Sequence, residues 1–185
     1  MRRINYIVIH HTGSKWGCAE EIIHWHTDPK PKGNGWSKPG YHYMINNGYP
    51  NYRSFYRRQK AKGWDGKIEN CDHGLVPPEQ TSNGVLGFNS KAINICLTGN
   101  FDEAQPTEAQ LNALEVLCLT LIKKYNIELK NVMGHREAIA LREKIQGKRK
   151  KDHKKSCPGS QFNPAAFRKR LAMANRETEY FYFDK

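Results

Sequence analysis

The chain of 185 residues lacks the features that define several large protein classes. No apolar run approaches the roughly 20 residues of a membrane-spanning helix, so we expect no transmembrane segment. The N-terminal segment MRRINYIVIHH has a short apolar part and no small-residue cleavage site after it, which argues against a signal peptide. The five cysteines are scattered and include no CxxC pair, so a disulfide framework is not expected. These absences predict a protein made in the cytoplasm, with a hydrophobic core of its own.

Acidic residues are few, because 18 aspartates and glutamates face 30 lysines and arginines, for a net charge of +12. Two stretches hold most of the excess: residues 53–67 carry a net charge of +5 and residues 142–155 carry +6. Such charge favours a polyanionic partner, whether nucleic acid, an acidic membrane surface or an anionic cell wall. Two solvated loops would account for the same charge. Zinc-finger spacing, a KH-type GxxG loop and an RNP-type strand are missing, so we expect no specific nucleic-acid partner.

The hydrophobic periodicity predicts an α/β (mixed α+β) fold. The run AINICLT at residues 92–98 is apolar enough for a central strand. The best predicted helix starts after Thr107, which forms a capping-box pattern with Gln110. The predicted order β-α-β-β-β-α-β-α gives a central mixed β-sheet flanked by helices. The expected strands cover residues 4–10, 41–45, 92–98 and 131–134, with one more after the turn at 65–66, and the other expected helices cover 18–27 and 164–174.

Neither an internal repeat nor an interdomain linker interrupts this pattern, so we expect a single domain over residues 1–175. Within it, residues 46–64 are interpreted as an insertion in a hairpin. Residues 138–155 are interpreted as a long basic loop. Residues 176–185 form an aromatic C-terminal tail that we expect to dock on the body or on a neighbouring chain.

Two predicted strands end in histidine. The first is VIHH at residues 8–11 and the second is VMGH at residues 132–135, and SCPG follows at residues 156–159. Two imidazoles and a thiolate are good ligands for Zn²⁺, and a catalytic zinc site typically has about three protein ligands. The histidines are far apart in the chain and form no local motif, so their spacing alone is a weak signal.

The segments IVIHHTGS, GYHYMI, FNSKAINICLTGNFD, PTEAQLNAL, VMGHRE and SCPG together resemble the zinc-dependent N-acetylmuramoyl-L-alanine amidases of the bacteriophage-lysozyme type, which are related to the peptidoglycan recognition proteins. The resemblance covers nearly the whole chain in the right order, apart from the insertions. It implies a mixed sheet with flanking helices, bound Zn²⁺, and hydrolysis of the amide between N-acetylmuramic acid and L-alanine in bacterial peptidoglycan. The implied zinc ligands are His10, His135 and Cys157, with His11 as the second choice at the first position.

The resemblance also implies two catalytic residues, Tyr41 in the GYH segment and Lys155 two positions before Cys157. Attack on an amide builds an oxyanion, and the leaving amine must gain a proton. We expect Lys155 to hold the oxyanion and Tyr41 to position the water or to donate a proton. Several other lysines surround Lys155, so a merely solvated lysine is the alternative at that position.

Three further residues are expected substrate contacts. The stretch EQTSNGVLGFNS lacks a histidine that many relatives carry, which makes Asn83 and Asn89 candidate polar contacts, with turn formation as the alternative. Trp64 belongs to the 46–64 insertion, whose aromatics lie among arginines. This insertion is expected to be either a substrate-side lid or a self-packed decoration.

The resemblance leaves alternatives in function and location. A non-catalytic peptidoglycan-binding module would share the fold, and a peptidase acting within the stem peptide would share the zinc chemistry. We expect an endolysin that reaches the cell wall or periplasm after release from the cytoplasm, while a bacterial or effector enzyme is the alternative. The sequence predicts no oligomeric state.

Overall fold

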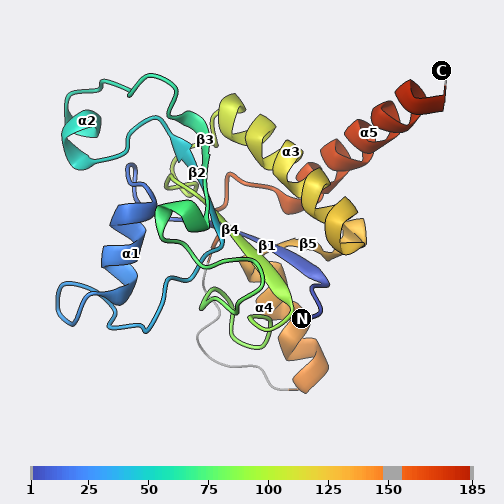
Figure 1. Cartoon of the computed structure of the whole chain (residues 1–185), viewed down its shortest axis with the longest axis horizontal. Helices are drawn as coiled ribbons and strands as arrows, with labels where there is room; N and C mark the ends of the chain where they lie inside the picture. Colours follow the sequence, from blue (N-terminus) through green and yellow to red (C-terminus); the bar gives the residue numbers. More distant parts are fainter. Residues whose placement is uncertain (1, 148–155, 184–185) are drawn as a thin grey trace.

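The computed structural model describes residues 2–147 and 156–183, and for residues 177–183 it describes the backbone alone (Figure 1). A five-stranded sheet with the order β3-β2-β4-β1-β5 forms its centre. The strands β2, β4, β1 and β5 run parallel to one another, and only β3 runs antiparallel to its neighbour β2. The predicted mixed sheet with flanking helices is therefore confirmed. The strands are β1 (Tyr6–His11), β2 (Tyr43–Asn47), β3 (Asp65–Glu69), β4 (Ala92–Leu97) and β5 (Val132–Gly134).

One face of the sheet is covered by two helices, α3 (Glu108–Tyr125) and α5 (Pro164–Phe183). Alternation along each strand sends every second side chain to this face, and these side chains are apolar on all the central strands. The helix α3 begins at the predicted N-cap, where Thr107 Oγ1 accepts from the N–H of Gln110 at 3.1 Å. The core on this face includes Ile7, Ile9, Ile93, Ile95, Leu97, Leu114, Leu121, Val132, Phe167 and Leu171.

The other face is covered in two separate places by α1 (Ala19–Thr27) and α4 (His135–Gln146). The α1 cluster consists of Ala19, Ile22, Met44, Leu75 and Cys96. The α4 cluster consists of Val8, Val85, Phe88, Ala92, Met133 and Ala138. Buried polar side chains lie on this face as well, and the principal ones are His10, His42, Ser82 and Asn94.

The predicted basic loop over residues 138–155 is wrong in its first half, because residues 138–146 belong to α4. Ala138 packs into the core beside β5 and Leu141 lies three residues further along the same helix face. The helix ends at Gly147, which takes the left-handed conformation that suits a C-cap glycine. The run at residues 148–155 lies outside the described residues.

Other element boundaries also differ from the prediction. The strand predicted over residues 41–45 occupies Tyr43–Asn47, so Tyr41 precedes it. The last helix was expected to end at 174, but α5 continues to Phe183, and most of the predicted tail is therefore helical backbone. The connection between β2 and β3 contains a short helix, α2 (Tyr52–Tyr56). The two remaining elements are the 3-10 helices η1 (Cys71–His73) and η2 (Leu129–Asn131).

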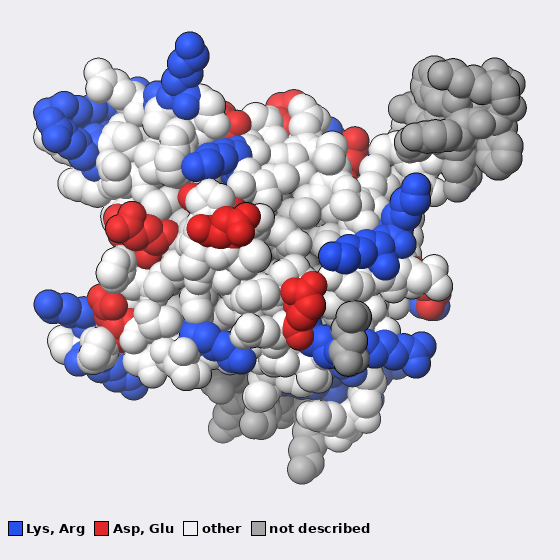
Figure 2. Space-filling model, viewed as in Figure 1, with Lys and Arg blue, Asp and Glu red and all other residues white. Residues whose placement is uncertain are grey.

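Charge and shape complete the description. Lysine and arginine side chains gather at the corner of the molecule that α2 forms (Figure 2). In Figure 1 the helix α5 projects beyond the body of the molecule toward the C-terminus. Among the described residues, no helix is both long enough and apolar enough to cross a bilayer.

Candidate metal centre

The two predicted histidine ligands are brought together by the pairing of β1 with β5. In the parallel register Ile9 lies opposite Gly134, so the next residue on each segment, His10 and His135, lie side by side. Their ring centroids are 4.7 Å apart. His135 is the first residue of α4, so the chain turns from strand into helix at the ligand itself. The pairing of two adjacent parallel strands therefore places residues that are far apart in sequence at one point.

Cys157 completes the group. Ligand atoms of His10, His135 and Cys157 all lie within 4.8 Å of one another, and no other such group of three or more metal-binding side chains occurs among the described residues. The Cys157 Sγ lies 3.8 Å from Nδ1 of His10. The predicted set of three ligands thus converges in space.

His10 is held in one orientation and one protonation state. Its side chain is buried, and its Nε2 lies 3.0 Å from Oδ1 of Asn94, which can only accept. Nε2 therefore carries the proton and Nδ1 presents its lone pair toward Cys157. Burial, followed by the neighbouring His135, lowers the pKa of His10 well below its ordinary value. A neutral imidazole is the form that binds a metal ion.

The Cys157 loop is fastened by Arg136, the residue that follows the ligand His135. The Arg136 guanidinium donates to the carbonyls of Ser156, Gly159 and Phe162 at 2.7 to 2.8 Å. Its backbone N–H donates to the carbonyl of Cys157 at 2.9 Å. One residue of α4 therefore ties the loop that carries the third ligand to the helix that carries the second.

Glu137 secures the start of the same helix. Its Oε2 accepts from the N–H of Gly134 at 3.0 Å, and both carboxylate oxygens accept from Arg168 of α5. Burial acts to raise the pKa of Glu137, but the hydrogen bonds from Arg168 and Gly134 leave it lowered overall. The three consecutive residues His135, Arg136 and Glu137 thus provide a ligand, a clamp on the Cys157 loop and a link to α5.

These residues fit Zn²⁺ by the chemistry of their donors. Zinc sites are built from imidazole nitrogen and thiolate sulfur, and catalytic ones keep about three protein ligands with one position left for water or substrate. The second ring nitrogen of a zinc-bound histidine usually donates to a neighbouring acceptor, as Nε2 of His10 does here. The ligands border a pocket of about 210 Å³ that gives access to them.

Tyr41 lies beside the ligands in this pocket. Its ring centroid is 5.0 Å from that of His10 and 5.2 Å from that of His26, on which Trp36 stacks. Burial, followed by the nearby Cys96 and Cys157 thiols, raises the pKa of Tyr41 well above its ordinary value. Its phenol therefore stays protonated and able to donate at neutral pH. The pocket lining is completed by His11, Gly40, Asn83 and Gly84.

The other predicted site residues have different positions. Asn83 lines the pocket, and its side chain donates to the carbonyl of Lys38 at 3.2 Å. Asn89 is not among the lining residues, because its Oδ1 accepts from the N–H of Val85 and closes a turn. His11 accepts from the N–H of Phe101 through Nδ1, so it borders the pocket without joining the ligand group. Lys155 lies outside the described residues.

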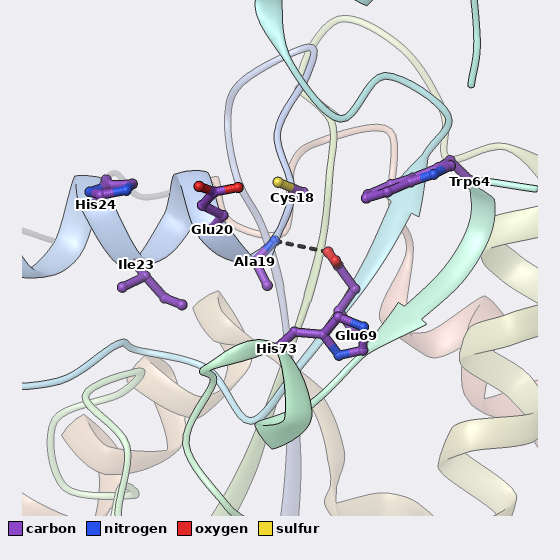
Figure 3. Close-up of a pocket in the computed structure, with 8 residues that line it drawn as sticks. All are labelled: Cys18, Ala19, Glu20, Ile23, His24, Trp64, Glu69 and His73. Atoms are coloured by element: carbon purple, nitrogen blue, oxygen red, sulfur yellow. Dashed lines mark hydrogen bonds between the residues drawn. The ribbon is translucent and has the colours of Figure 1, made fainter. Parts of the chain in front are cut away.

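Trp64 is separated from the metal centre and lines a second pocket with residues of α1, β3 and η1 (Figure 3). At the base of that pocket, Glu69 accepts from the N–H of Ala19 at 2.8 Å and so caps α1 (Figure 3). The Nζ of Lys67 lies 3.8 Å from the centroid of the Trp64 ring. Trp64 is therefore not among the residues that line the metal pocket, and its expected contact with substrate stays a prediction.

The side chains behind His10 were not predicted from the sequence. Asn94 stands in the apolar strand β4, and its burial beside His10 depends on the pairing of Val8 with Asn94. A polar residue in the middle of an otherwise apolar strand was the available signal. His42 is fully buried as well, and its Nδ1 accepts from the backbone N–H of Asn94.

Comparison with known proteins fits this geometry. The family model Amidase_2, described as N-acetylmuramoyl-L-alanine amidase, matches residues 1–160. The chain belongs to the N-acetylmuramoyl-L-alanine amidase family. This places it in the amidase class of enzymes that act on peptidoglycan. No curated protein matches the chain.

Solved amidase-family structures share the fold. The N-acetylmuramoyl-L-alanine amidase LysC from Clostridium intestinale URNW is 24% identical with a TM-score of 0.65, covering 92% of this chain and 87% of that chain. The Ph2119 endolysin from the Thermus scotoductus MAT2119 bacteriophage is 22% identical with a TM-score of 0.62, covering 92% and 86%. A point mutant of Drosophila PGRP-LB in complex with tracheal cytotoxin is 19% identical with a TM-score of 0.59, covering 88% and 79%.

Proposed function

We propose that this amidase cuts the amide bond between N-acetylmuramic acid and L-alanine in bacterial peptidoglycan with the help of bound zinc. The observation that carries the proposal is the convergence of His10, His135 and Cys157 within 4.8 Å, beside a pocket that Tyr41 also lines. Two imidazoles and one thiolate form a donor set that suits a catalytic zinc ion. When bound, zinc supplies Lewis acidity and lowers the pKa of water to about 7.

The protein prepares its ligands for this role. The lowered pKa of His10 keeps Nδ1 free of a proton at neutral pH, so no proton competes for the ligand position. The three bonds from the Arg136 guanidinium hold the Cys157 loop against α4. The buried contact of His10 with Asn94 fixes the plane of the imidazole. The site is therefore pre-organised before substrate arrives.

Tyr41 is proposed to act on the substrate. Its phenol remains protonated, so it can donate a hydrogen bond to the amide oxygen as that oxygen gains negative charge. The low-dielectric surroundings that raise its pKa also strengthen such a bond. Asn83, at the edge of the same pocket, is a proposed polar contact for the stem peptide.

Lys155 is proposed as a second group for the oxyanion. It stands two residues before the ligand Cys157, next to Lys154 in the sequence. A matched pair of variants, Lys155→Met and Lys154→Met, separates a catalytic lysine from a generally basic segment. We expect kcat to fall in Lys155→Met alone, and equal effects in both variants would contradict this role.

The place of action is proposed to be the bacterial cell wall, which the enzyme reaches after release from the cytoplasm. The solved neighbours with this fold include a bacteriophage endolysin, which supports such a role. The basic corner at α2 suits contact with an anionic wall. The place of action can be measured by adding the protein to cells from outside and by expressing it inside them. The two experiments compare lysis from each side of the membrane.

The decisive experiment is mass spectrometry of purified peptidoglycan digested by the zinc-loaded wild type and by Cys157→Ala. We expect the wild type to release intact stem peptides with a free L-alanine amino terminus, and Cys157→Ala to release none. A cut within the stem peptide would contradict the substrate assignment. Binding of the wall by both proteins without any cut would indicate the non-catalytic recognition module instead.

A further inference from the structure

A chain of buried polar side chains runs behind His10, away from the pocket. His10 contacts Asn94 at 3.0 Å, Asn94 Nδ2 donates to Ser82 Oγ at 2.8 Å, and Ser82 Oγ lies 3.3 Å from Nδ1 of His42. All four side chains are buried, with exposed fractions of 1% for His10 and 0% for the others. His10 belongs to β1 and Asn94 to β4. His42 directly precedes β2, and Ser82 lies in the loop before β4. None of the three residues behind His10 belongs to the ligand group.

The direction of each hydrogen bond is set from the far end. The N–H of Asn94 donates to Nδ1 of His42 at 2.9 Å, so this nitrogen must be an acceptor. Nε2 of His42 then carries its proton toward the carbonyl of Gln80 at 3.1 Å, and Nη2 of the Arg2 guanidinium lies 2.9 Å from the same nitrogen. Burial is the first cause that lowers the pKa of His42 to about 4, so the ring is neutral at pH 7.

The acceptor on His42 orients Ser82 and, through it, Asn94. The Ser82 hydroxyl, 3.3 Å from Nδ1 of His42, shares the single lone pair of that nitrogen with the N–H of Asn94, and its own lone pair then faces Nδ2 of Asn94. The amide of Asn94 is thereby turned so that Oδ1 faces His10. A reversed amide would present N–H to Nε2 of His10 and would move the histidine proton to Nδ1, the atom that faces Cys157.

Close packing keeps the amide in place. A Cβ added at Gly84 would lie 2.4 Å from Cγ of Asn94, so the loop that carries Ser82 rests directly on the amide. Glycine at 84 is therefore required for this approach. A side chain so enclosed cannot turn over without moving the loop.

We propose that Asn94 is a positioning residue for the metal centre, and that Ser82 and His42 orient its amide so that Nδ1 of His10 remains free to bind zinc. The proposal rests on the zinc site of the proposed function, but it concerns residues outside the ligand group. Hydrogen-bond partners of zinc-bound histidines typically change metal affinity by about 10- to 100-fold when removed.

The first test uses the metal-free protein and requires no activity. Histidine ¹⁵N NMR reports which ring nitrogen of His10 carries the proton. We expect the Nε2–H form in the wild type and a mixture of the two forms in Asn94→Ala. A wild-type His10 protonated at Nδ1, or an unchanged Nε2–H form in Asn94→Ala, would overturn the proposal.

The second test measures zinc affinity by competition with a chelator. We expect Asn94→Ala to bind zinc about 10- to 100-fold more weakly. Ser82→Ala should show a smaller loss, since it only releases the orientation of the amide. Asn94→Asp should restore affinity, because a carboxylate also accepts from Nε2 and the Ser82 hydroxyl can turn to donate to it.

Asn46→Ala is the matched control. Asn46 is an equally buried asparagine on β2, and its Nδ2 donates to Glu69 at 2.9 Å, away from His10. The variant Asn46→Ala should be less stable than the wild type and should bind zinc with the same affinity. Equal zinc affinities in Asn94→Ala and Asn46→Ala would overturn the proposal. Should Asn94→Ala fail to fold, Ser82→Ala provides the comparison, and a zinc affinity in Ser82→Ala equal to that in Asn46→Ala would then overturn the proposal.

These outcomes are independent of the reaction. If the protein cuts no peptidoglycan but the Asn94 variants change the His10 proton position and the zinc affinity, the amidase proposal fails and this inference stands. If the wild type cuts peptidoglycan as expected but Asn94→Ala changes neither the His10 proton position nor the zinc affinity, this inference fails and the amidase proposal stands.

Discussion

The two faces of the sheet use the same strands for different purposes. On β1, Ile7 and Ile9 face α3 and α5, while Val8 and His10 face the opposite side. The first face is mainly apolar and forms the larger core. The second face has its apolar contacts divided between the α1 and α4 clusters, and it also carries the ligand His10 and the polar chain behind it. The side chains that form the larger core and those of the candidate metal centre therefore alternate along the same strand.

This difference explains how the site can tolerate buried polar groups. Burial of an unpaired polar group costs stability, so each polar residue on the second face needs a partner. His10, Asn94, Ser82 and His42 contact one another in turn. The chain ends at Nε2 of His42, which lies against the carbonyl of Gln80 and the guanidinium of Arg2. The first face then supplies most of the buried apolar surface, while the polar contacts on the second face hold His10 in its orientation.

The largest expected effect is on the apolar face. Leu114 of α3 is fully buried there, so Leu114→Ala should lower the free energy of unfolding by about 2–5 kcal/mol through lost contacts and a cavity. Urea unfolding measures this change. The folded fraction should still bind zinc as the wild type does. A loss of zinc affinity without a loss of stability would break the proposed separation of the two faces.

Two tyrosines give the sharpest comparison of activity. Tyr41 belongs to the α1 side and Tyr43 packs on the apolar core of the other side. Tyr41→Phe should lower kcat by about 100-fold, because a hydrogen-bond donor to the developing charge is lost. Tyr43→Phe is the control and should leave kcat unchanged. Steady-state rates on a soluble muropeptide measure both, and equal rates for the two variants would contradict the role of Tyr41.

The pH dependence of stability tests the buried end of the polar chain. The folded pKa of His42 is about 4, below the ordinary value of 6.5, so the unfolded chain binds a proton between these values and the folded protein does not. Its contribution is present above pH 6.5 and is lost as pH falls toward 4. Lowering the pH from 7 to 5 should remove about 2 kcal/mol through this group.

The variant His42→Gln isolates this contribution. Unfolding in urea at pH 7 and pH 5 should show a difference between the two pH values that is smaller in the variant by about 2 kcal/mol. An equal pH dependence in both proteins would mean that the pKa of His42 is the same in the folded and unfolded protein, so that the folded protein also takes up this proton below pH 6.5, which contradicts the acceptor role of its Nδ1.

The smallest expected effect concerns the exposed corner at α2. Arg53, Arg57 and Arg58 are exposed there, beside the exposed rings of Tyr52 and Tyr56. Changing the three arginines to glutamate should weaken binding to whole cell walls by a few-fold, because surface charges are screened by salt. Wall sedimentation at low and high salt measures this. Activity on a soluble muropeptide should not change, and a loss there would place α2 at the active site.

Much of this architecture was predictable, because alternation and helical spacing are local signals. The central strand around Ile95 and the capping box at Thr107 follow from nearby residues, and both are confirmed. The metal ligands were predicted from a resemblance and not from spacing, since the contact of His10 with His135 depends on the register of β1 and β5. Asn94 was missed because only the register with Val8 shows that it lies behind a ligand.

One error had another cause. Residues 138–146 were expected to be a loop because of their charge, while the spacing of Ala138 and Leu141 directs one side of α4 onto the core. Trp64 was expected near the substrate because an aromatic residue among arginines suits a sugar. The structure places it in the pocket beside α1 (Figure 3), and its contact with substrate stays a prediction.

X-ray absorption at the zinc K-edge of the purified, zinc-loaded protein tests the central claim most directly. We predict a first shell with one sulfur at about 2.3 Å and nitrogens at about 2.0–2.1 Å. In Cys157→Ser the first shell around zinc should contain no sulfur, while its nitrogen contribution should remain. A wild-type shell of nitrogen and oxygen alone would contradict the assignment of His10, His135 and Cys157 as the metal centre.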